Sequence, residues 1–174
     1  MGKIGRWLSV LLFPLLLTGC MADPYADGIE ALENGQYEEA AGQFKEAVKK
    51  DENKADSYRG LGIALWETKD YEGAKEALKK ALEEGSKKTG TICNLLGSCE
   101  FQSGNMEEAL KYFEEGQKDA GNSDSLTQSM RFNSICAYEK LGDIETAKSL
   151  LKQYTADYPE DEEAVKEAQF LETR

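Results

Sequence analysis

Residues 35–40 read Gly-Gln-Tyr-Glu-Glu-Ala, and a related hexapeptide returns three more times further along the chain. The copies are Lys-Asp-Tyr-Glu-Gly-Ala at 69–74, Gly-Asn-Met-Glu-Glu-Ala at 104–109 and Gly-Asp-Ile-Glu-Thr-Ala at 142–147, so they start 34, 35 and 38 residues apart. Two positions at fixed offsets after each copy hold Phe44 and Ala47, Leu78 and Ala81, Phe113 and Gly116, and Leu151 and Tyr154. Self-similarity at this period is the signature of a stacked repeat architecture.

The spacing of small and large side chains predicts that each repeat is a pair of helices. Small residues occur where two helices would cross, and Leu, Tyr and Phe recur at i, i+3, i+4 and i+7, as on a helix face that packs against another helix. No segment alternates with the period of two that a strand needs. The small residues are Ala40, Ala47, Gly62, Ala74, Ala81, Gly97, Ala109 and Ala147. We predict an all-α chain with helices near 26–34, 37–49, 54–68, 71–84, 89–102, 105–118, 126–141, 144–157 and 161–172.

The whole pattern resembles the tetratricopeptide repeat, a helix-turn-helix unit whose motif runs W-x₂-L-G-x₂-Y, followed by Ala, Phe, Ala and Pro. Residues that match the first part are Tyr58, Leu61, Gly62 and Leu65 in one copy, and Cys93, Leu96, Gly97 and Glu100 in the next; Pro159 matches the closing proline. The resemblance implies a right-handed α-solenoid of about four repeats within 26–159, at about 21–54, 55–88, 90–123 and 128–161. Residues 160–174 would form a capping helix over the end of the stack.

Two repeats depart from this motif. The first has Pro24 and Asp27 where an aromatic residue and Leu are expected, so we expect its first helix to start late. The fourth has Ser134-Ile135 in place of Leu-Gly, and Tyr154 in place of a small residue. Either its helices are spaced differently or Tyr154 covers the final helix.

The N-terminal segment predicts an exported, lipid-anchored protein. Lys3 and Arg6 precede an apolar stretch of eleven residues, 7–17, which is shorter than the ~20 that span a bilayer, so 1–19 is predicted to be a signal peptide. Its end, Leu-Thr-Gly-Cys at 17–20, resembles the lipobox of bacterial lipoproteins. That resemblance implies cleavage before Cys20, a diacylglyceryl and N-acyl lipid on Cys20, and a short tether over 20–25. The alternative is an ordinary secretory signal that happens to end near a cysteine.

The lipobox also implies a location. A lipoprotein would sit outside the cytoplasm, anchored to the cell membrane or to an outer membrane. In the Gram-negative lipoprotein family an aspartate after the lipidated cysteine commonly marks retention at the inner membrane. Met21 stands at that position, which points to the outer membrane if the cell has one.

Composition excludes several classes of function. The chain has 33 Asp and Glu against 21 Lys and Arg, a net charge of −12, so it would repel nucleic acid and anionic lipid headgroups. It contains no histidine, which excludes Ser-His-Asp and Cys-His catalysis and every His-ligated metal site. With 40% hydrophobic and 31% charged residues, the balance is typical of a folded, soluble body.

No motif of the sequence predicts catalysis or a cofactor. No two of the cysteines at 93, 99 and 136 form a CxxC motif. We interpret Cys93, Cys99 and Cys136 as small apolar core residues. The carboxylates form no calcium loop, and 60–62 (Gly-Leu-Gly) lies inside a helical repeat and lacks the Lys-Ser/Thr of a phosphate loop. The sequence therefore predicts no enzyme, no metal, no small-molecule substrate and no cofactor other than the covalent lipid.

A repeat stack curves and presents an extended concave groove, and in tetratricopeptide proteins the first helix of each repeat lines it. This register places eight candidate partner-binding residues there: Arg59, Ile63, Trp66, Asn94, Ser98, Phe101, Phe132 and Lys140. Cys136 and Glu139 share the same helix face. Aromatic anchors with Asn and Arg donors suit a peptide-binding surface. The alternative is that Trp66 and Phe101 pack only between helices.

We therefore predict a membrane-anchored tetratricopeptide lipoprotein that acts as a protein–protein scaffold or adaptor in the bacterial cell envelope. The alternative is an assembly factor or pilotin for a secretion, pilus or outer-membrane protein complex. In both cases the partner is another protein or a peptide segment. The Lys, Asn and Arg set with which some family members grip a C-terminal carboxylate is incomplete here, so a carboxylate-clamp co-chaperone is not supported.

Overall fold

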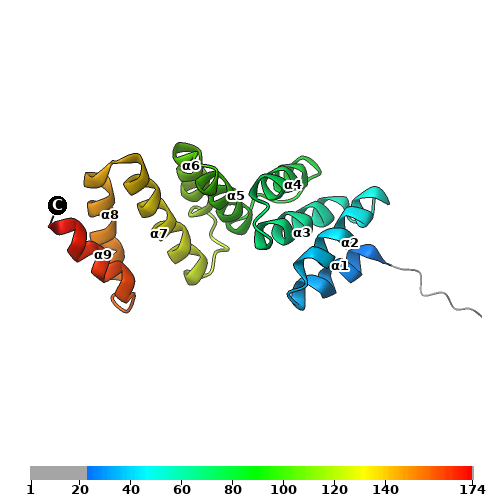
Figure 1. Cartoon of the computed structure of the whole chain (residues 1–174), viewed down its shortest axis with the longest axis horizontal. Coiled ribbons are helices and arrows are strands. Elements are labelled where there is room, and N and C mark those ends of the chain that lie inside the picture. Colours follow the sequence, from blue (N-terminus) through cyan, green and yellow to red (C-terminus); the bar gives the residue numbers. More distant parts are fainter. Residues whose placement is uncertain (1–22, 174) are drawn as a thin grey trace, which may run out of the picture.

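The computed structural model describes residues 23–173, and every regular secondary-structure element within them is an α-helix (Figure 1). The predicted leader 1–19, Cys20 and Met21 lie outside the described residues. The helices are α1 Pro24–Glu33, α2 Tyr37–Lys49, α3 Lys54–Glu67, α4 Tyr71–Glu83, α5 Gly90–Gln102, α6 Met106–Gly116, α7 Asp124–Leu141, α8 Ile144–Asp157 and α9 Glu162–Glu172. Across 23–173, no helix combines the length and the apolarity that crossing a bilayer requires.

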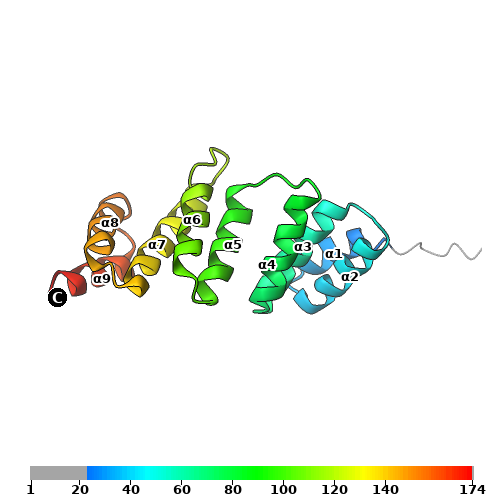
Figure 2. The ribbon, with the colours of Figure 1, turned by 90° about the horizontal axis from the view of Figure 1, so that it is seen from above.

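The helices form four pairs that stack side by side, followed by a single helix. Figures 1 and 2 show the pairs α1/α2, α3/α4, α5/α6 and α7/α8 in sequence order along one long axis, with α9 at the end. Each helix contacts the next one in the chain, and the first helices of neighbouring pairs also meet, as α1 does with α3 and α5 with α7. The predicted all-α solenoid is confirmed.

The repeated hexapeptide forms the turn inside each pair. Its first residue adopts the left-handed backbone conformation in all four copies, with φ of 71° at Gly35, 66° at Lys69, 83° at Gly104 and 77° at Gly142. A glycine tolerates this conformation without steric cost, which explains why three of the four copies begin with Gly. The residue after it caps the second helix in two copies; the Asp70 carboxylate, for example, accepts the backbone N–H of the third helical residue at 3.0 Å.

The first helix starts late in its repeat, as expected. Helix α1 has 10 residues, whereas α3 in the next repeat has 14, and both end just before the hexapeptide. It begins at Pro24, and its capping residue is Asp23, whose carboxylate accepts the Ala26 N–H at 3.1 Å. A proline at the first position of a helix loses no hydrogen bond, because that N–H has no partner inside the helix. Pro24 therefore marks the start of this shorter helix.

The core of the first repeats depends on close approach of backbones. The fully buried ring of Phe44 contacts both α1 and α3, and a Cβ added at Gly28 or at Gly60 would lie within 3.0 Å of it. Gly62 against Leu78 and Gly97 against Phe113 repeat the arrangement in the next two pairs. The four alanines that end the hexapeptide copies are all fully buried: Ala40, Ala74, Ala109 and Ala147.

The fourth pair follows the second of the two predicted alternatives, because Tyr154 does cover the final helix. Its ring is 2% exposed, and its hydroxyl donates to Asp161, the capping residue of α9, at 2.7 Å. Ser134 and Ile135 are buried as well, and the Ser134 hydroxyl donates to the backbone oxygen of Met130 at 2.8 Å. Hydrogen bonds and packing against the capping helix thus accommodate the larger residues of this repeat.

Two of the three cysteines in the described part of the chain are core residues. Cys93 and Cys99 are buried, and Cys136 is half-buried on α7; all three are free thiols. Burial raises the pKa of the Cys93 thiol, and it raises the pKa of Cys99 and of Cys136 to about 11. At neutral pH these thiols stay protonated and are poor nucleophiles.

Candidate functional site

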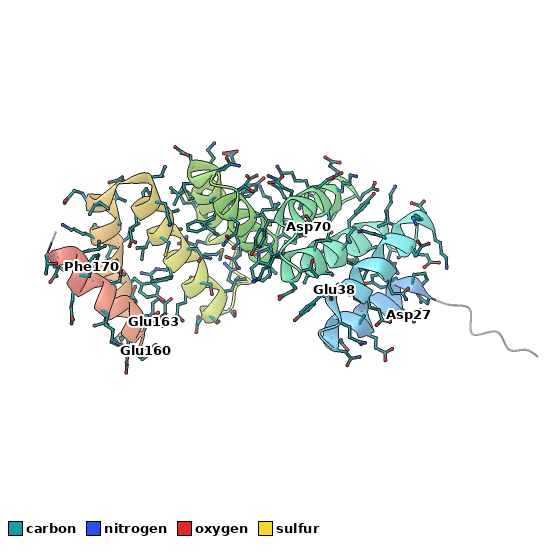
Figure 3. All side chains as sticks on the ribbon, in the orientation of Figure 1. Asp27, Glu38, Asp70, Glu160, Glu163 and Phe170 are labelled. Atoms are coloured by element: carbon teal, nitrogen blue, oxygen red, sulfur yellow. The ribbon has the colours of Figure 1, made fainter. Side chains whose placement is uncertain are left out.

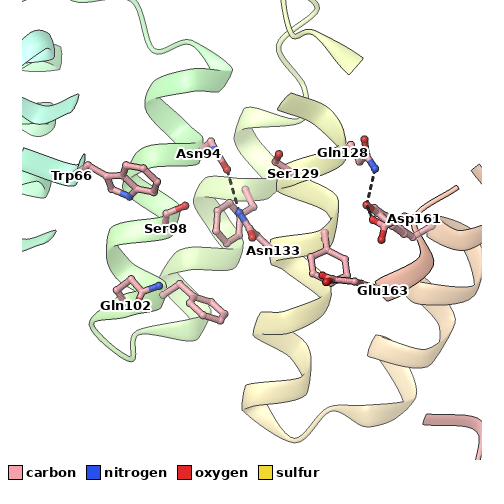
Figure 4. Close-up of a pocket in the computed structure, with 13 residues that line it drawn as sticks. Trp66, Asn94, Ser98, Gln102, Gln128, Ser129, Asn133, Asp161 and Glu163 are labelled. Atoms are coloured by element: carbon pink, nitrogen blue, oxygen red, sulfur yellow. Dashed lines mark hydrogen bonds between the residues drawn. The ribbon is translucent and has the colours of Figure 1, made fainter. Parts of the chain in front are cut away.

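A hollow in the described surface runs across the first helices of successive pairs. We call it the A-face groove; its volume is about 560 Å³, and α3, α5 and α7 form its floor while α8 and the start of α9 close one end (Figure 4). Its lining residues are Trp66, Asn94, Ser98, Phe101, Gln102, Phe113, Gln128, Ser129, Phe132, Asn133, Tyr154, Asp161 and Glu163.

Five of the eight residues proposed from the sequence meet in this groove: Trp66, Asn94, Ser98, Phe101 and Phe132. They come from three helices that are far apart in sequence, and the helical register alone was enough to group them. The structure brings these five together on one surface.

The other three proposed residues lie elsewhere. Arg59 and Ile63 line a neighbouring hollow of about 330 Å³ at the loops before α5 and α7, and Arg59 is paired with Asp56 at 2.9 Å. Lys140 is exposed near the end of α7 and lines neither hollow. It follows Phe132 by eight residues, about 12 Å along a helix, so it lies beyond the part of α7 that lines the groove.

The aromatic rings of the groove belong both to its wall and to the core. Trp66 is partly buried against the cluster of the first two repeats, and Phe101 against the cluster around Phe113. Phe132 packs on Tyr154 with ring centroids 5.5 Å apart. Each ring thus packs against the core on one side and lines the groove on the other. The sequence left open whether Trp66 and Phe101 are groove or core residues, and they are both.

Amide and hydroxyl groups lie between the rings. The side-chain amide of Asn133 donates to the Asn94 side-chain oxygen at 3.5 Å, so the two amides bridge α7 and α5 (Figure 4). The indole N–H of Trp66 is buried and has no hydrogen-bond partner among the described residues. Such a donor is costly to leave unsatisfied, and a bound acceptor would remove that cost.

Charge is present at one end of the groove only. There the Tyr154 hydroxyl accepts from Gln128 at 3.0 Å and donates to Asp161. Burial, followed by the hydrogen bond to Asp161, raises the pKa of Tyr154 to about 12. That hydrogen bond and the one from the Ala164 backbone N–H lower the pKa of Asp161, so this carboxylate stays ionised at neutral pH.

Sequence reasoning missed the polar half of this site. Gln128 stands four residues before Phe132 on the same helix face and inside the predicted helix 126–141, so the α-helical period could have included it. Asp161 and Glu163 carry no such signal, because they enter the groove only through the way α9 folds back on α8.

The arrangement suits binding through surface contacts. Aromatic faces, amides and hydroxyls on rigid helices can hold an extended chain by packing and by hydrogen bonds to its backbone. Within 23–173, no three His, Cys, Asp or Glu residues are grouped so that they could hold a metal ion.

Family models match most of the described chain. Three models, each of the tetratricopeptide repeat, match residues 25–89, 90–118 and 131–161. The chain belongs to the tetratricopeptide repeat family. Proteins of this family typically act as protein-interaction scaffolds.

Individual proteins with a similar sequence or a similar structure are found as well. It is 30% identical over 118 residues to the Photosystem I assembly protein Ycf3 of Synechococcus sp. (strain CC9605), a match that covers 63% of this chain and 65% of that protein. Among solved structures, YrrB, described as a TPR protein with an unusual peptide-binding site, has a TM-score of 0.71 at 21% identity, with 85% of this chain and 74% of that one covered. MamA has a TM-score of 0.72 at 16% identity, over 85% and 78% of the two chains. The likeness to these two structures concerns the fold.

Proposed function

We propose that this tetratricopeptide protein holds an extended segment of a partner protein in the A-face groove and works as a scaffold or adaptor, without catalysis. One observation carries the proposal: aromatic rings from α3, α5 and α7, together with side-chain amides from α5 and α7, line a single groove. Rings supply apolar contact area and amides supply backbone hydrogen bonds, the two components of peptide recognition. The description of YrrB as a peptide-binding protein of the same fold agrees with this use.

The proposed adaptor is anchored to a membrane through lipid on Cys20, outside the cytoplasm. Support comes from the leader, in which Lys3, Arg6, the short apolar stretch and Leu-Thr-Gly-Cys at 17–20 occur together. Two or more acyl chains anchor a protein stably. Since α1 begins at Pro24, the tether is short and the solenoid would lie close to the lipid surface.

The anchor is tested by fatty-acid labelling of cells that express the chain. Wild-type protein should incorporate labelled palmitate and sediment with membranes, whereas Cys20→Ala should remain uncut and unlabelled. Wild-type protein that is soluble and unlabelled would overturn the anchor and leave the groove proposal standing.

A second candidate is an assembly factor, which binds its partner only while a larger complex is being built. The similarity to the Photosystem I assembly protein Ycf3 favours it. A pilotin for a secretion, pilus or outer-membrane complex would be one form of such a factor. A pulse-chase of the bound partner separates the candidates, because an assembly factor releases it as the complex matures and an adaptor keeps it.

The groove itself is tested by photocrosslinking in cells. A benzoylphenylalanine at Ser98, in the groove, should capture a defined partner, and the same probe at Lys111, on the exposed surface of α6, serves as the matched control. Crosslinks from Lys111 alone would place binding outside the groove. Replacing Ser98 by Trp, which fills the groove without removing a core side chain, should abolish the capture.

A further inference from the structure

We propose that the segment held in the A-face groove carries a basic side chain, Lys or Arg, that pairs with Glu163 at the α9 end. This inference rests on the proposed function, since it names the chemistry of the occupant of the same groove. Figure 3 places Glu163 at the start of α9, and Figure 4 shows it across the groove from Trp66.

The charges of the groove select a cation. None of its thirteen lining residues is Lys or Arg, while two of them, Asp161 and Glu163, are carboxylates at the same end. The chain as a whole carries a net charge of −12, which adds a long-range attraction for basic segments. An acidic peptide or a C-terminal carboxylate would meet only like charge at this end.

The two carboxylates have different roles. Asp161 is already engaged by the Tyr154 hydroxyl at 2.7 Å and by the Ala164 backbone N–H at 3.1 Å, so it holds the start of α9 in place. Glu163 lines the groove, is exposed, and forms no side-chain hydrogen bond or ion pair with another described residue. Its carboxylate is therefore the one available to a ligand, and Asp161 is a positioning residue.

The opposite end of the groove holds a hydrogen-bond donor that lacks an acceptor. The buried Trp66 indole N–H lacks a partner, and it can donate only. A backbone carbonyl of an extended segment provides such an acceptor, and the Asn94–Asn133 amide pair in between can bond to backbone groups of either kind. The occupant is thus an extended, uncharged stretch with one basic side chain placed toward α9.

Peptide selection tests this pairing. A phage-displayed library of random nonapeptides is selected on the purified full chain, and single peptides are measured by fluorescence anisotropy. We expect enrichment of Lys or Arg at one position, and replacing that residue by Gln should weaken binding about tenfold, with a loss of affinity as salt is raised. Glu163→Lys should weaken the same peptides by a similar factor, and Glu163→Gln by less.

The matched control is Glu160→Lys, which makes the same charge change two residues before α9 at an exposed position outside the groove lining. It should change the affinity less than twofold. Circular dichroism checks that each variant keeps its helical content, and Glu163→Gln provides a readout if Glu163→Lys does not fold.

Two negative outcomes are distinguishable. Peptides that lose binding with Ser98→Trp, yet carry no enriched basic residue or are unaffected by Glu163→Lys, would overturn the pairing and keep the groove as the binding site. If no peptide is selected, or if binding survives Ser98→Trp, both the pairing and the proposed function fall.

Discussion

The two ends of the solenoid are held together in different ways. At the N-terminal end Phe44 lies against glycines of α1 and α3, within a cluster of apolar side chains that extends from α1 to α5. At the C-terminal end Tyr154 is almost as buried, but its hydroxyl links Gln128 of α7 to Asp161 at the start of α9. The N-terminal end depends on an aromatic ring packed against glycine backbones, which carry no Cβ. The C-terminal end depends on a chain of hydrogen bonds.

This difference explains why the groove carries its two carboxylates at the α9 end. Close glycine crossings exclude polar side chains, because no room remains for them and an unsatisfied polar group is costly in such a core. A buried tyrosine, by contrast, can form hydrogen bonds with amides and carboxylates at the edge of the core. The polar end of the A-face groove is therefore a product of the departures in the fourth repeat and of the cap.

The largest expected effect is the loss of the ring at the N-terminal end. Phe44→Ala should lower the free energy of unfolding by about 3–5 kcal/mol, because it removes a fully buried ring and leaves a cavity between three helices. Thermal and urea unfolding followed by circular dichroism measure it. Leu141→Ala, at a side chain that is 39% exposed, is the control and should stay within about 0.5 kcal/mol. If both variants lost the same free energy of unfolding, the packing of Phe44 against the glycines would not be what holds this end together.

A smaller effect is expected from adding a single methyl group at the crossing. Gly60→Ala should cost about 1–3 kcal/mol, because the new Cβ would lie within 3.0 Å of a Phe44 ring that α1 confines on its other side. Gly42→Ala is the matched control in α2, where a Cβ meets nothing within 4 Å. That variant should gain up to about 1 kcal/mol from helix propensity. The same sign for both changes would show that the crossing tolerates a Cβ.

The hydrogen bonds at the C-terminal end should contribute somewhat less. Tyr154→Phe should cost about 1–2 kcal/mol near neutral pH, because Gln128 loses an acceptor and Asp161 loses a donor. Tyr25→Phe, at a half-buried ring of the N-terminal cluster, serves as the control.

The pH dependence of this pair sharpens the test. The Tyr154 hydrogen bond lowers the pKa of Asp161 in the folded state, so its stabilisation is present above the ordinary aspartate pKa and is lost as the pH falls through the lowered value. The difference between wild type and Tyr154→Phe should therefore shrink below about pH 4. A difference independent of pH would assign the loss to packing instead.

The smallest expected effect concerns Glu139 of α7. Burial, followed by the nearby Glu167, raises the pKa of Glu139, so the charged form is disfavoured in the folded chain. Glu139→Gln should then stabilise the protein by up to about 0.5 kcal/mol at pH 7, and the gain should vanish below about pH 4, where the wild-type carboxyl is protonated. Glu107→Gln, on the exposed surface of α6, should show no such trend.

Local chemistry was sufficient for most of the fold. The hexapeptide at 35–40 and its copies define the turns, because a left-handed residue followed by a helix start is a property of a few neighbouring residues. Helix positions followed from the apolar period, and the register also grouped Trp66, Asn94, Ser98, Phe101 and Phe132 on one face. The late start of α1 also followed from Pro24, because proline fits the first position of a helix and not its interior.

Residues within one or two turns of helix are enough to predict the repeat, the helix faces and the side of the stack on which a groove would lie. Where the groove ends and which charges close it depend on how separate helices pack against one another. Asp161 and Glu163 enter it because α9 packs on α8 and Tyr154 bonds to Asp161, whereas Lys140 lies outside it near the end of α7. Such contacts join side chains from separate helices, and no local pattern specifies them.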